Sequence, residues 1–489
     1  MRERLLAWAG LASRPVGDSR ILSAEDCEGL LARAHAMAEG GGDTEIEVRC
    51  WWQGELRWAR SRVSLSSDRR DVAVSVRRTL PNGTEGAVLT NQLDDASIEG
   101  AVRAAERASA LGSEAGRGIG YYPPFPEYAR PAAAVWSDAT YGLTAEARGD
   151  VARALAAPAE AKGMLSAGYI EVRAGAHARI GTGFDAQRPQ GRHAVWHQPY
   201  TRWTQARCSL TVRDASGAGS GWAGLSSYDW ARVDPQALAA RALEKCIASR
   251  NPVAIEPGRY TVILEPQAVA DLVGILAKTF HETWAAPGRV WYLTFDNALS
   301  LNRSKLGLKV VDERVTIRHD FADPDLGIVA RYLESPKPVA WIENGVLTAL
   351  GHDMSYEVRM LEGRHALRSG IGFRMDGGET SVEEMIRTTQ RGLLVTRFSN
   401  LDLLDEESLL STGLTRDGLW LIENGKITKA VKNFRFTESP LFALNNIDQL
   451  GEPVRTLHAS TSEWGELQPA IVPPLKIRDF SFTSTIDAI

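Results

Sequence analysis

Residues 260–290 constrain the fold of this chain more than any other stretch, because they read as a strand, a sharp turn and a buried helix. The run YTVIL at 260–264 is typical of a strand. Pro266 then suits the first turn of a helix, where its missing N–H is no loss. The apolar residues that follow recur at helical spacing and predict one continuous buried face: Val269, Leu272, Val273, Leu276 and Phe280.

A histidine and a glutamate, His281 and Glu282, stand at the end of this face, just before a Pro-Gly stop at 287–288. Many zinc peptidases begin their metal site with such a pair, in which the imidazole binds the metal and the carboxylate activates metal-bound water. A second histidine should follow, but the positions four and five residues on are alanines, the latter being Ala286. The motif is therefore incomplete, and the alternative is that His281 only packs at a helix terminus.

The composition of the chain argues against several classes of function. The chain has 489 residues, of which 44% are hydrophobic and 24% charged, as in an ordinary globular protein. Its net charge of −5 argues against a broad nucleic-acid surface. No run of about 18 apolar residues occurs, so we expect no membrane span, and we interpret the first 20 residues as a helix rather than a signal peptide. The cysteines match no zinc ribbon or disulfide framework and indicate reduced thiols in the cytoplasm: Cys27, Cys50, Cys208 and Cys246.

The first half of the chain carries signals for strand, turn, strand and then helix. This order predicts an α+β fold with an antiparallel sheet. The signals are an alternating run at 45–49, another at 72–76, the turn Pro81-Asn82-Gly83, and a helix over 96–111 capped by Asp95.

A change in character then divides the chain. Asn251-Pro252 and Pro257-Gly258 are its strongest break signals. We therefore predict an N-terminal α+β domain at 1–252 and a β-rich C-terminal domain at 253–489.

Two similar hairpins characterise the second half. The segments VAWIENGVLTAL at 339–350 and LWLIENGKITKA at 419–430 are each a strand, an Asn-Gly pair and a second strand. Asn344-Gly345 and Asn424-Gly425 fit type I′ turns. Together they predict a sandwich-like or barrel-like arrangement.

Two further segments could bind a ligand. The Gly- and Ser-rich stretch at 216–230 could cradle a phosphate, although the absence of a strand–glycine–helix unit with a lysine favours a plain loop. Arg364 and His365 lie in a Gly- and Arg-rich segment and could bind a peptide carboxylate, with a solvated loop as the alternative.

With these residues in view, the sequence resembles the TldD/PmbA (TldE) family of zinc metallopeptidases and their partner subunits. The resemblance covers most of the chain and is most specific in LTRDGLWLIENGKITKAVKNFRF at 414–436. It implies an α/β N-terminal domain and a β-rich C-terminal domain. It also implies, in the catalytic TldD-like subunits, an HExxxH motif and a distal cysteine as zinc ligands, with peptides cleaved in a cavity enclosed by two subunits. The PmbA/TldE-like partner subunits share the fold and lack the ligands.

Mapped onto this chain, the family motif is degenerate. His281 is the candidate metal ligand and Glu282 the candidate catalytic residue, but Ala286 stands where the second histidine belongs. The cysteine is expected within 456–465, which contains none. The resemblance therefore implies the zinc-free partner type, with no cofactor of its own unless zinc binds rearranged ligands or comes from the partner. It also implies a heterodimer with a paralogous catalytic subunit or else a homodimer, a peptide substrate, and neither nucleic acid nor membrane as partner.

Two alternatives remain at this stage. The chain could be an active peptidase with rearranged metal ligands, drawn from His319, His352, His365 or His458. It could also be a peptide-binding or scaffold protein without a hydrolytic partner.

Overall fold

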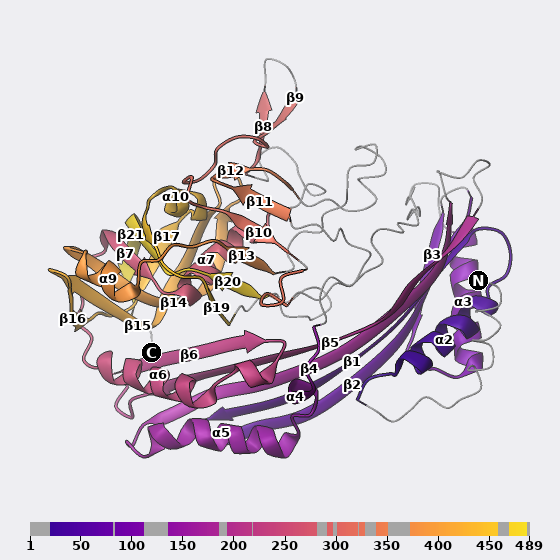
Figure 1. Ribbon diagram of the computed structural model, residues 1–489, viewed down its shortest axis with the longest axis horizontal. Coiled ribbons are helices and arrows are strands. Elements are labelled where there is room, and N and C mark those ends of the chain that lie inside the picture. The colour runs from indigo at the N-terminus through magenta and orange to yellow at the C-terminus, as the bar shows by residue number, and fades with distance from the viewer. Residues whose placement is uncertain are drawn as a thin grey trace.

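The structure is a computed structural model, and it shows an α+β protein with two bodies. One body is a long curved sheet with helices along it, and the other is a β-rich body above one end of that sheet (Figure 1). The first 19 residues and the predicted turn at Asn82-Gly83 lie outside the described part of the chain. The structure describes residues 20–81, 84–111, 135–184, 193–217, 219–280, 291–296, 301–320, 322–327, 339–350, 372–457 and 469–486.

The first half of the chain forms a six-stranded antiparallel sheet in the order β3-β2-β1-β4-β5-β6. Its four central strands have 17 to 21 residues, several times the usual strand length, so the sheet's twist produces the curved surface in Figure 1. The strands are β1 (Asp43–Ala59), β2 (Arg62–Thr79), β3 (Glu85–Thr90), β4 (Leu165–Phe184), β5 (His193–Arg213) and β6 (Ser220–Ser227).

Apolar and polar residues alternate along the strands, and this decides which face of the sheet is buried. Ile46 and Val48 of β1 lie opposite Ile180 and Ala178 of β4, and all four are fully buried on one apolar face. Helices cover this face, because each presents an apolar stripe to it. They are α2 (Ala24–Ala36), α3 (Asp95–Leu111), α5 (Ala145–Glu160) and α6 (Pro235–Ala248), accompanied by the short α4 (Asp138–Tyr141) and η1 (Trp230–Arg232).

The predicted helix at 96–111 is confirmed as α3, but its cap is displaced by one residue. Asp94, not Asp95, accepts a hydrogen bond from the Ser97 backbone N–H at 2.9 Å. Asp95 instead forms an ion pair with Arg33 of α2. The glycine-rich segment at 216–230 also differs from the plain loop that the sequence favoured, because residues 220–227 form β6.

Five strands of the second half close into a ring. β7 pairs in parallel with β14 and antiparallel with β21, while β17 and β15 close the circuit because β15 also pairs with β14. Closure leaves no free edge in the ring. The strands are β7 (Gly258–Leu264), β14 (Arg391–Asp405), β15 (Leu410–Glu423), β17 (Phe434–Glu438) and β21 (Leu475–Thr485).

A second six-stranded sheet, in the order β12-β11-β10-β13-β20-β19, accompanies this ring. Helix α7 (Pro266–Ala277) contacts both β14 of the ring and β20 of this sheet, so it packs between the two. The sheet consists of β10 (Ile317–His319), β11 (Val339–Glu343), β12 (Val346–Leu347), β13 (Phe373–Met375), β19 (Val454–Arg455) and β20 (Ala470–Val472). The remaining elements are β8 (Leu293–Asp296), β9 (Leu301–Ser304), β16 (Lys426–Ala430), β18 (Ile447–Leu450), α9 (Val382–Arg387) and α10 (Pro440–Asn445).

Both predicted Asn-Gly hairpins are confirmed. Asn344 and Gly345 have φ values of 49° and 78°, and Asn424 and Gly425 have values of 49° and 76°. Two consecutive positive φ values are what a type I′ turn requires. The first hairpin joins β11 to β12 and the second joins β15 to β16.

The two bodies have separate apolar cores. One core draws its residues from 21–246 and the other from 262–482. The domain boundary between 252 and 253 remains a prediction. Within the described ranges, no helix has the length and apolar character needed to cross a membrane.

Candidate functional site

The site residues predicted from the sequence lie outside the part of the chain that the structure describes. This applies to His281, Glu282, Ala286, Arg364 and His365. The described residues that lead to these positions nevertheless define the surroundings of the candidate site.

Helix α7 leads toward His281 and is buried along most of its length, as the apolar spacing predicts. It ends earlier than the sequence suggests. The last helical residue is Ala277, and residues 278–280 no longer continue the helix. The Thr279 hydroxyl donates to the Leu276 carbonyl at 2.7 Å in this last turn. The prediction of an unbroken helix up to the Pro-Gly stop is therefore wrong.

Aromatic packing fixes the chain just after this helix. Phe280 is fully buried, and its ring stacks on Trp341 with centroids 5.0 Å apart. Trp291 contacts the edge of the same ring at 6.2 Å and donates its indole N–H to Thr279. The residue before His281 is thus held rigidly in the C-terminal core.

Two polar side chains of α7 connect it to its neighbours. Gln267 Nε2 donates to Asp271 Oδ1 at 2.8 Å, while Gln267 Oε1 accepts the Leu457 backbone N–H at 2.9 Å. Asp271 Oδ2 accepts the backbone N–H of Phe398 on β14 at 3.0 Å. Burial raises the pKa of Asp271 to about 6. This pair therefore fixes α7 relative to β14 and to Leu457.

Sequence reasoning missed this connection, although a signal for it was present. Gln267 and Asp271 are polar residues four apart on an otherwise apolar helix, and such positions share one face. Buried polar groups need partners, so the pair indicates a hydrogen-bonded contact with another segment.

The sheet face opposite the helices is polar. Glu171 is buried on it and accepts hydrogen bonds from Arg173 and from Arg207 Nη2, the latter at 2.7 Å. Arg207 also lies 5.0 Å above the ring of Tyr169. Glu55 stands next to Glu171 in register and has its own arginine partner. Burial lowers the pKa of Arg173 and raises the pKa of Tyr169.

The C-terminal body covers the β6 end of this polar face (Figure 1). Arg397 of β14 lies 5.0 Å over the ring of Trp222, and the Ser226 hydroxyl donates to the Thr456 carbonyl at 2.9 Å. Because the next residue, Leu457, bonds to α7, three features meet here: the polar sheet face, helix α7 and the start of segment 456–465. We call this meeting point the junction site.

The histidines and cysteines of the described chain do not form a metal site. His319 is buried, its ring stacks on Trp341 at 5.6 Å, and its Nδ1 is 2.9 Å from the Gly372 carbonyl oxygen. All four cysteines are free and buried in the N-terminal core: Cys27, Cys50, Cys208 and Cys246. Within the described ranges, no group of three or more His, Cys, Asp or Glu residues could hold a metal ion.

The second half of the chain matches a family model. Residues 257–484 match the model described as the PmbA/TldA metallopeptidase C-terminal domain. No curated protein sequence matches the chain.

Three solved structures share the fold of the whole chain. TldE from Thermococcus kodakarensis is 15% identical with a TM-score of 0.71, covering 94% of this chain and 100% of its own. A proposed modulator of a DNA gyrase from Thermotoga maritima is 17% identical with a TM-score of 0.71, covering 94% and 99%. A proposed modulator of DNA gyrase from Bacteroides thetaiotaomicron is 16% identical with a TM-score of 0.67, covering 94% and 98%.

Proposed function

Because this chain belongs to the TldD/PmbA family, we propose that it is the zinc-free subunit of a two-subunit metallopeptidase and holds peptide substrate for a catalytic partner. In this proposal the partner is a TldD-like paralogue that supplies the complete zinc site. The chain forms a heterodimer with it in the cell and forms a homodimer when expressed alone.

The proposal rests on the zinc ligands that this chain has and lacks. A catalytic zinc site typically needs three protein ligands and an open position. This chain has His281, but it has Ala286 at the second position and no cysteine after Cys246. The cysteines it does have are packed in the N-terminal core, so none can replace the missing ligand without unfolding that core. The residues present do not fit a zinc ion held in the family's manner.

The polar sheet face supports the peptide-holding role. Its long strands present the buried carboxylate of Glu171 and the half-buried guanidinium groups of Arg173 and Arg207. Groups of these kinds bind the amides and the carboxylate of a peptide. At the junction site this face lies next to Thr456, and the following residue, Leu457, is bonded to helix α7. In this proposal the peptide lies along the face toward α7, the helix that precedes the family motif in sequence.

The alternative with rearranged ligands finds less support. Of its candidate replacement ligands, only His319 lies in the described ranges, and its ring is held in the C-terminal core by Trp341 and Gly372. The scaffold alternative would be favoured if the native chain purified without any hydrolytic partner.

Reconstitution tests the proposal. We expect neither this chain nor its catalytic paralogue to cleave unfolded peptide efficiently alone, and the mixture to do so. His281→Ala and Glu282→Gln in this chain should leave the activity of the mixture unchanged, whereas the corresponding changes in the paralogue, the matched control, should abolish it. Loss of activity from both sets of variants would contradict the proposal.

Restoring the motif tests the donor-set argument separately. Ala286→His alone should not create a zinc site, since one ligand is still missing. Ala286→His combined with Ser460→Cys should give the best chance of tight zinc binding, measured by competition with a chromogenic chelator. Equal zinc affinity of the single and double variants would contradict the role assigned to the cysteine.

A further inference from the structure

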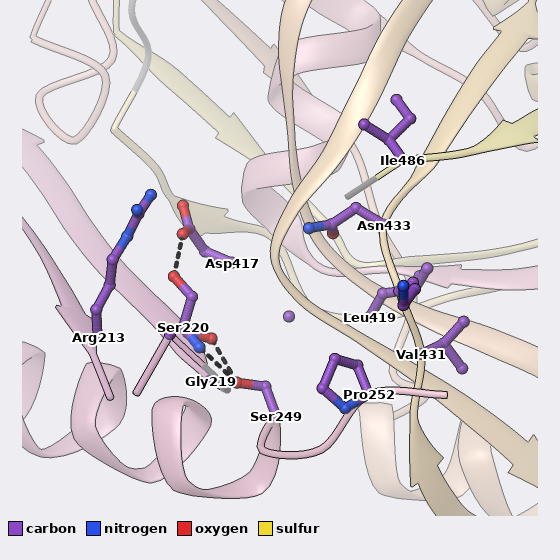
Figure 2. A pocket seen from close by; sticks show the side chains of 13 residues that line it. Arg213, Gly219, Ser220, Ser249, Pro252, Asp417, Leu419, Val431, Asn433 and Ile486 are labelled. Carbon is purple, nitrogen blue, oxygen red and sulfur yellow. Dashed lines mark hydrogen bonds between the residues drawn. The ribbon is translucent and has the colours of Figure 1, made fainter. Parts of the chain in front are cut away.

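A pocket of about 430 Å³ lies between the two halves of the chain (Figure 2). This volume is typical of small-molecule sites. None of its lining residues belongs to the candidate metal or peptide site. Arg213, Ser220 and Ser249 line it from the first half, and Leu419, Val431 and Ile486 line it from the second.

The first wall is the turn that joins β5 to β6. Gly217 adopts a φ of +76° there, and its N–H donates to the Asp214 carbonyl at 2.9 Å. Gly219 and Gly221 then let β6 lie directly on α6, because a Cβ at either would come within 2.5 Å of a helix carbonyl oxygen. The glycine-rich segment therefore builds a tight wall for the pocket.

The second wall is a bulge in β15. Asp417 and Gly418 together face the single residue Thr396 of β14, and both have positive φ values, 56° and 136°. The bulge turns the Asp417 carboxylate toward β6, where it accepts the Ser220 hydroxyl at 2.5 Å and the Arg397 Nε–H at 2.9 Å. The negative charge of Asp417 is therefore matched before any ligand binds.

Positive charge remains in the pocket. Asp214, the residue beside Arg213, forms its ion pair with Arg250 at 2.5 Å. Within the described residues the Arg213 guanidinium has neither a hydrogen bond nor an ion pair, and Figure 2 shows it at the edge of the pocket. Lys432 also lines the pocket, but it already has an interaction partner. The pocket is thus suited to an anion.

The opposite side is apolar. Leu419, Val431 and Ile486 stand across the pocket from Arg213, with Pro252 at its base (Figure 2). The hydroxyls of Ser220 and Ser249 are already engaged, the first with Asp417 and the second with the Ser220 carbonyl at 2.7 Å. A ligand therefore meets one cationic wall and one apolar wall.

We propose that this pocket binds a small carboxylate with an apolar side chain, such as an N-acylated hydrophobic amino acid or the last residue of a short peptide. The carboxylate pairs with Arg213 and the side chain lies against Leu419, Val431 and Ile486. This inference is independent of the proposed zinc-free role, since Arg213 and the three apolar residues take no part in that role. Bound ligand bridges the two halves and stabilises their arrangement.

Calorimetry with the full chain tests this proposal, using N-acetyl-L-leucine as the probe and N-acetyl-L-leucinamide as its uncharged match. The acid should bind, and the amide should bind at least about tenfold more weakly because it cannot form the charged pair. Arg213→Gln should weaken binding of the acid at least about tenfold, and Arg213→Lys should weaken it less. Arg62→Gln, at an exposed arginine on β2, is the matched control and should change nothing.

Several results would overturn the proposal. One is equal binding of acid and amide, and another is an equal loss of affinity from Arg62→Gln and Arg213→Gln. Inorganic phosphate binding as tightly as N-acetyl-L-leucine would show that the apolar wall contributes nothing. Absence of binding by the unmodified chain at millimolar acid would also reject it. If the Arg213 variants fail to fold, the comparison of acid with amide on the unmodified chain still decides.

Discussion

Replacing Asp271 by asparagine should change how the stability of the C-terminal half depends on pH. Asp271 keeps some exposed surface as a whole residue, but its carboxylate is enclosed by protein. It accepts hydrogen bonds from Phe398 N–H and Gln267 Nε2, yet burial outweighs these and raises its pKa to about 6. An aspartate in an unfolded chain has a pKa of about 3.9.

The sign of the effect follows from this difference. The raised pKa means that ionisation is easier in the unfolded chain, so this group lowers the free energy of unfolding as pH rises from about 4 to about 6. Two pKa units correspond to roughly 3 kcal/mol. Asparagine cannot ionise and lacks this dependence. It also offers one acceptor where Asp271 offers two, so a constant cost of about 1–3 kcal/mol is expected from the N–H left unpaired.

Urea unfolding of the wild type and of Asp271→Asn from about pH 4 to about pH 8 measures the contribution of Asp271. Groups that titrate in both proteins cancel when one free energy of unfolding is subtracted from the other. The stability advantage of the wild type over Asp271→Asn should shrink by up to about 3 kcal/mol across that range. Asp402→Asn, at an exposed carboxylate on β14, is the matched control and should show no such trend. If the free energies of unfolding of the wild type and Asp271→Asn differ by the same amount, to within about 0.5 kcal/mol, at every pH, the raised pKa of Asp271 is refuted.

Three further predictions concern packing and domain structure. Phe280→Ala should lower the free energy of unfolding by about 3–5 kcal/mol in urea, because it removes a fully buried ring from between two tryptophans; a change below about 1 kcal/mol would contradict this packing. Lys245→Ala should lower the free energy of unfolding by about 3–5 kcal/mol in the same assay, since among the described residues it leaves Glu265 with only the exposed Arg241 as an ion-pair partner; an unchanged free energy would show that the Lys245–Glu265 pair contributes nothing. A fragment of residues 253–489 should fold cooperatively, because the core drawn from 262–482 lies within it; a fragment without a cooperative thermal transition would contradict the predicted boundary.

Local signals predicted much of the fold. The Asn-Gly pairs identified both type I′ hairpins, since only residues that tolerate positive φ fit such turns. The apolar spacing after Pro266 identified the buried face of α7, because residues three and four apart lie on one face of a helix. The hairpins also predicted a sandwich-like or barrel-like arrangement, which the closed ring confirms. The order in which the strands of the ring pair was not predictable in this way. It depends on the parallel pairing of β7 with β14, which joins segments more than a hundred residues apart.

The site residues predicted from the family motif, His281 and Glu282, lie outside the described ranges and stay a prediction. The polar pair on α7 and the contact between Ser226 and Thr456 were not predicted, because they depend on tertiary packing. The bulge at Asp417 likewise has no local signal beyond the Asp-Gly pair, and such a pair is typical of a turn rather than of a bulge inside a strand. Features that arise where distant segments meet are the ones that sequence reasoning missed.

Zinc content distinguishes a zinc-free subunit from a peptidase with rearranged ligands. The chain is purified alone and together with its catalytic paralogue, and zinc is measured by mass spectrometry against protein concentration. We expect less than about a tenth of an equivalent in the chain alone, because one imidazole and one carboxylate form a weak, exchangeable site. We expect one equivalent per heterodimer, unaffected by His281→Ala in this chain. Stoichiometric zinc in the chain alone that is lost on His281→Ala would contradict the zinc-free role and favour rearranged ligands.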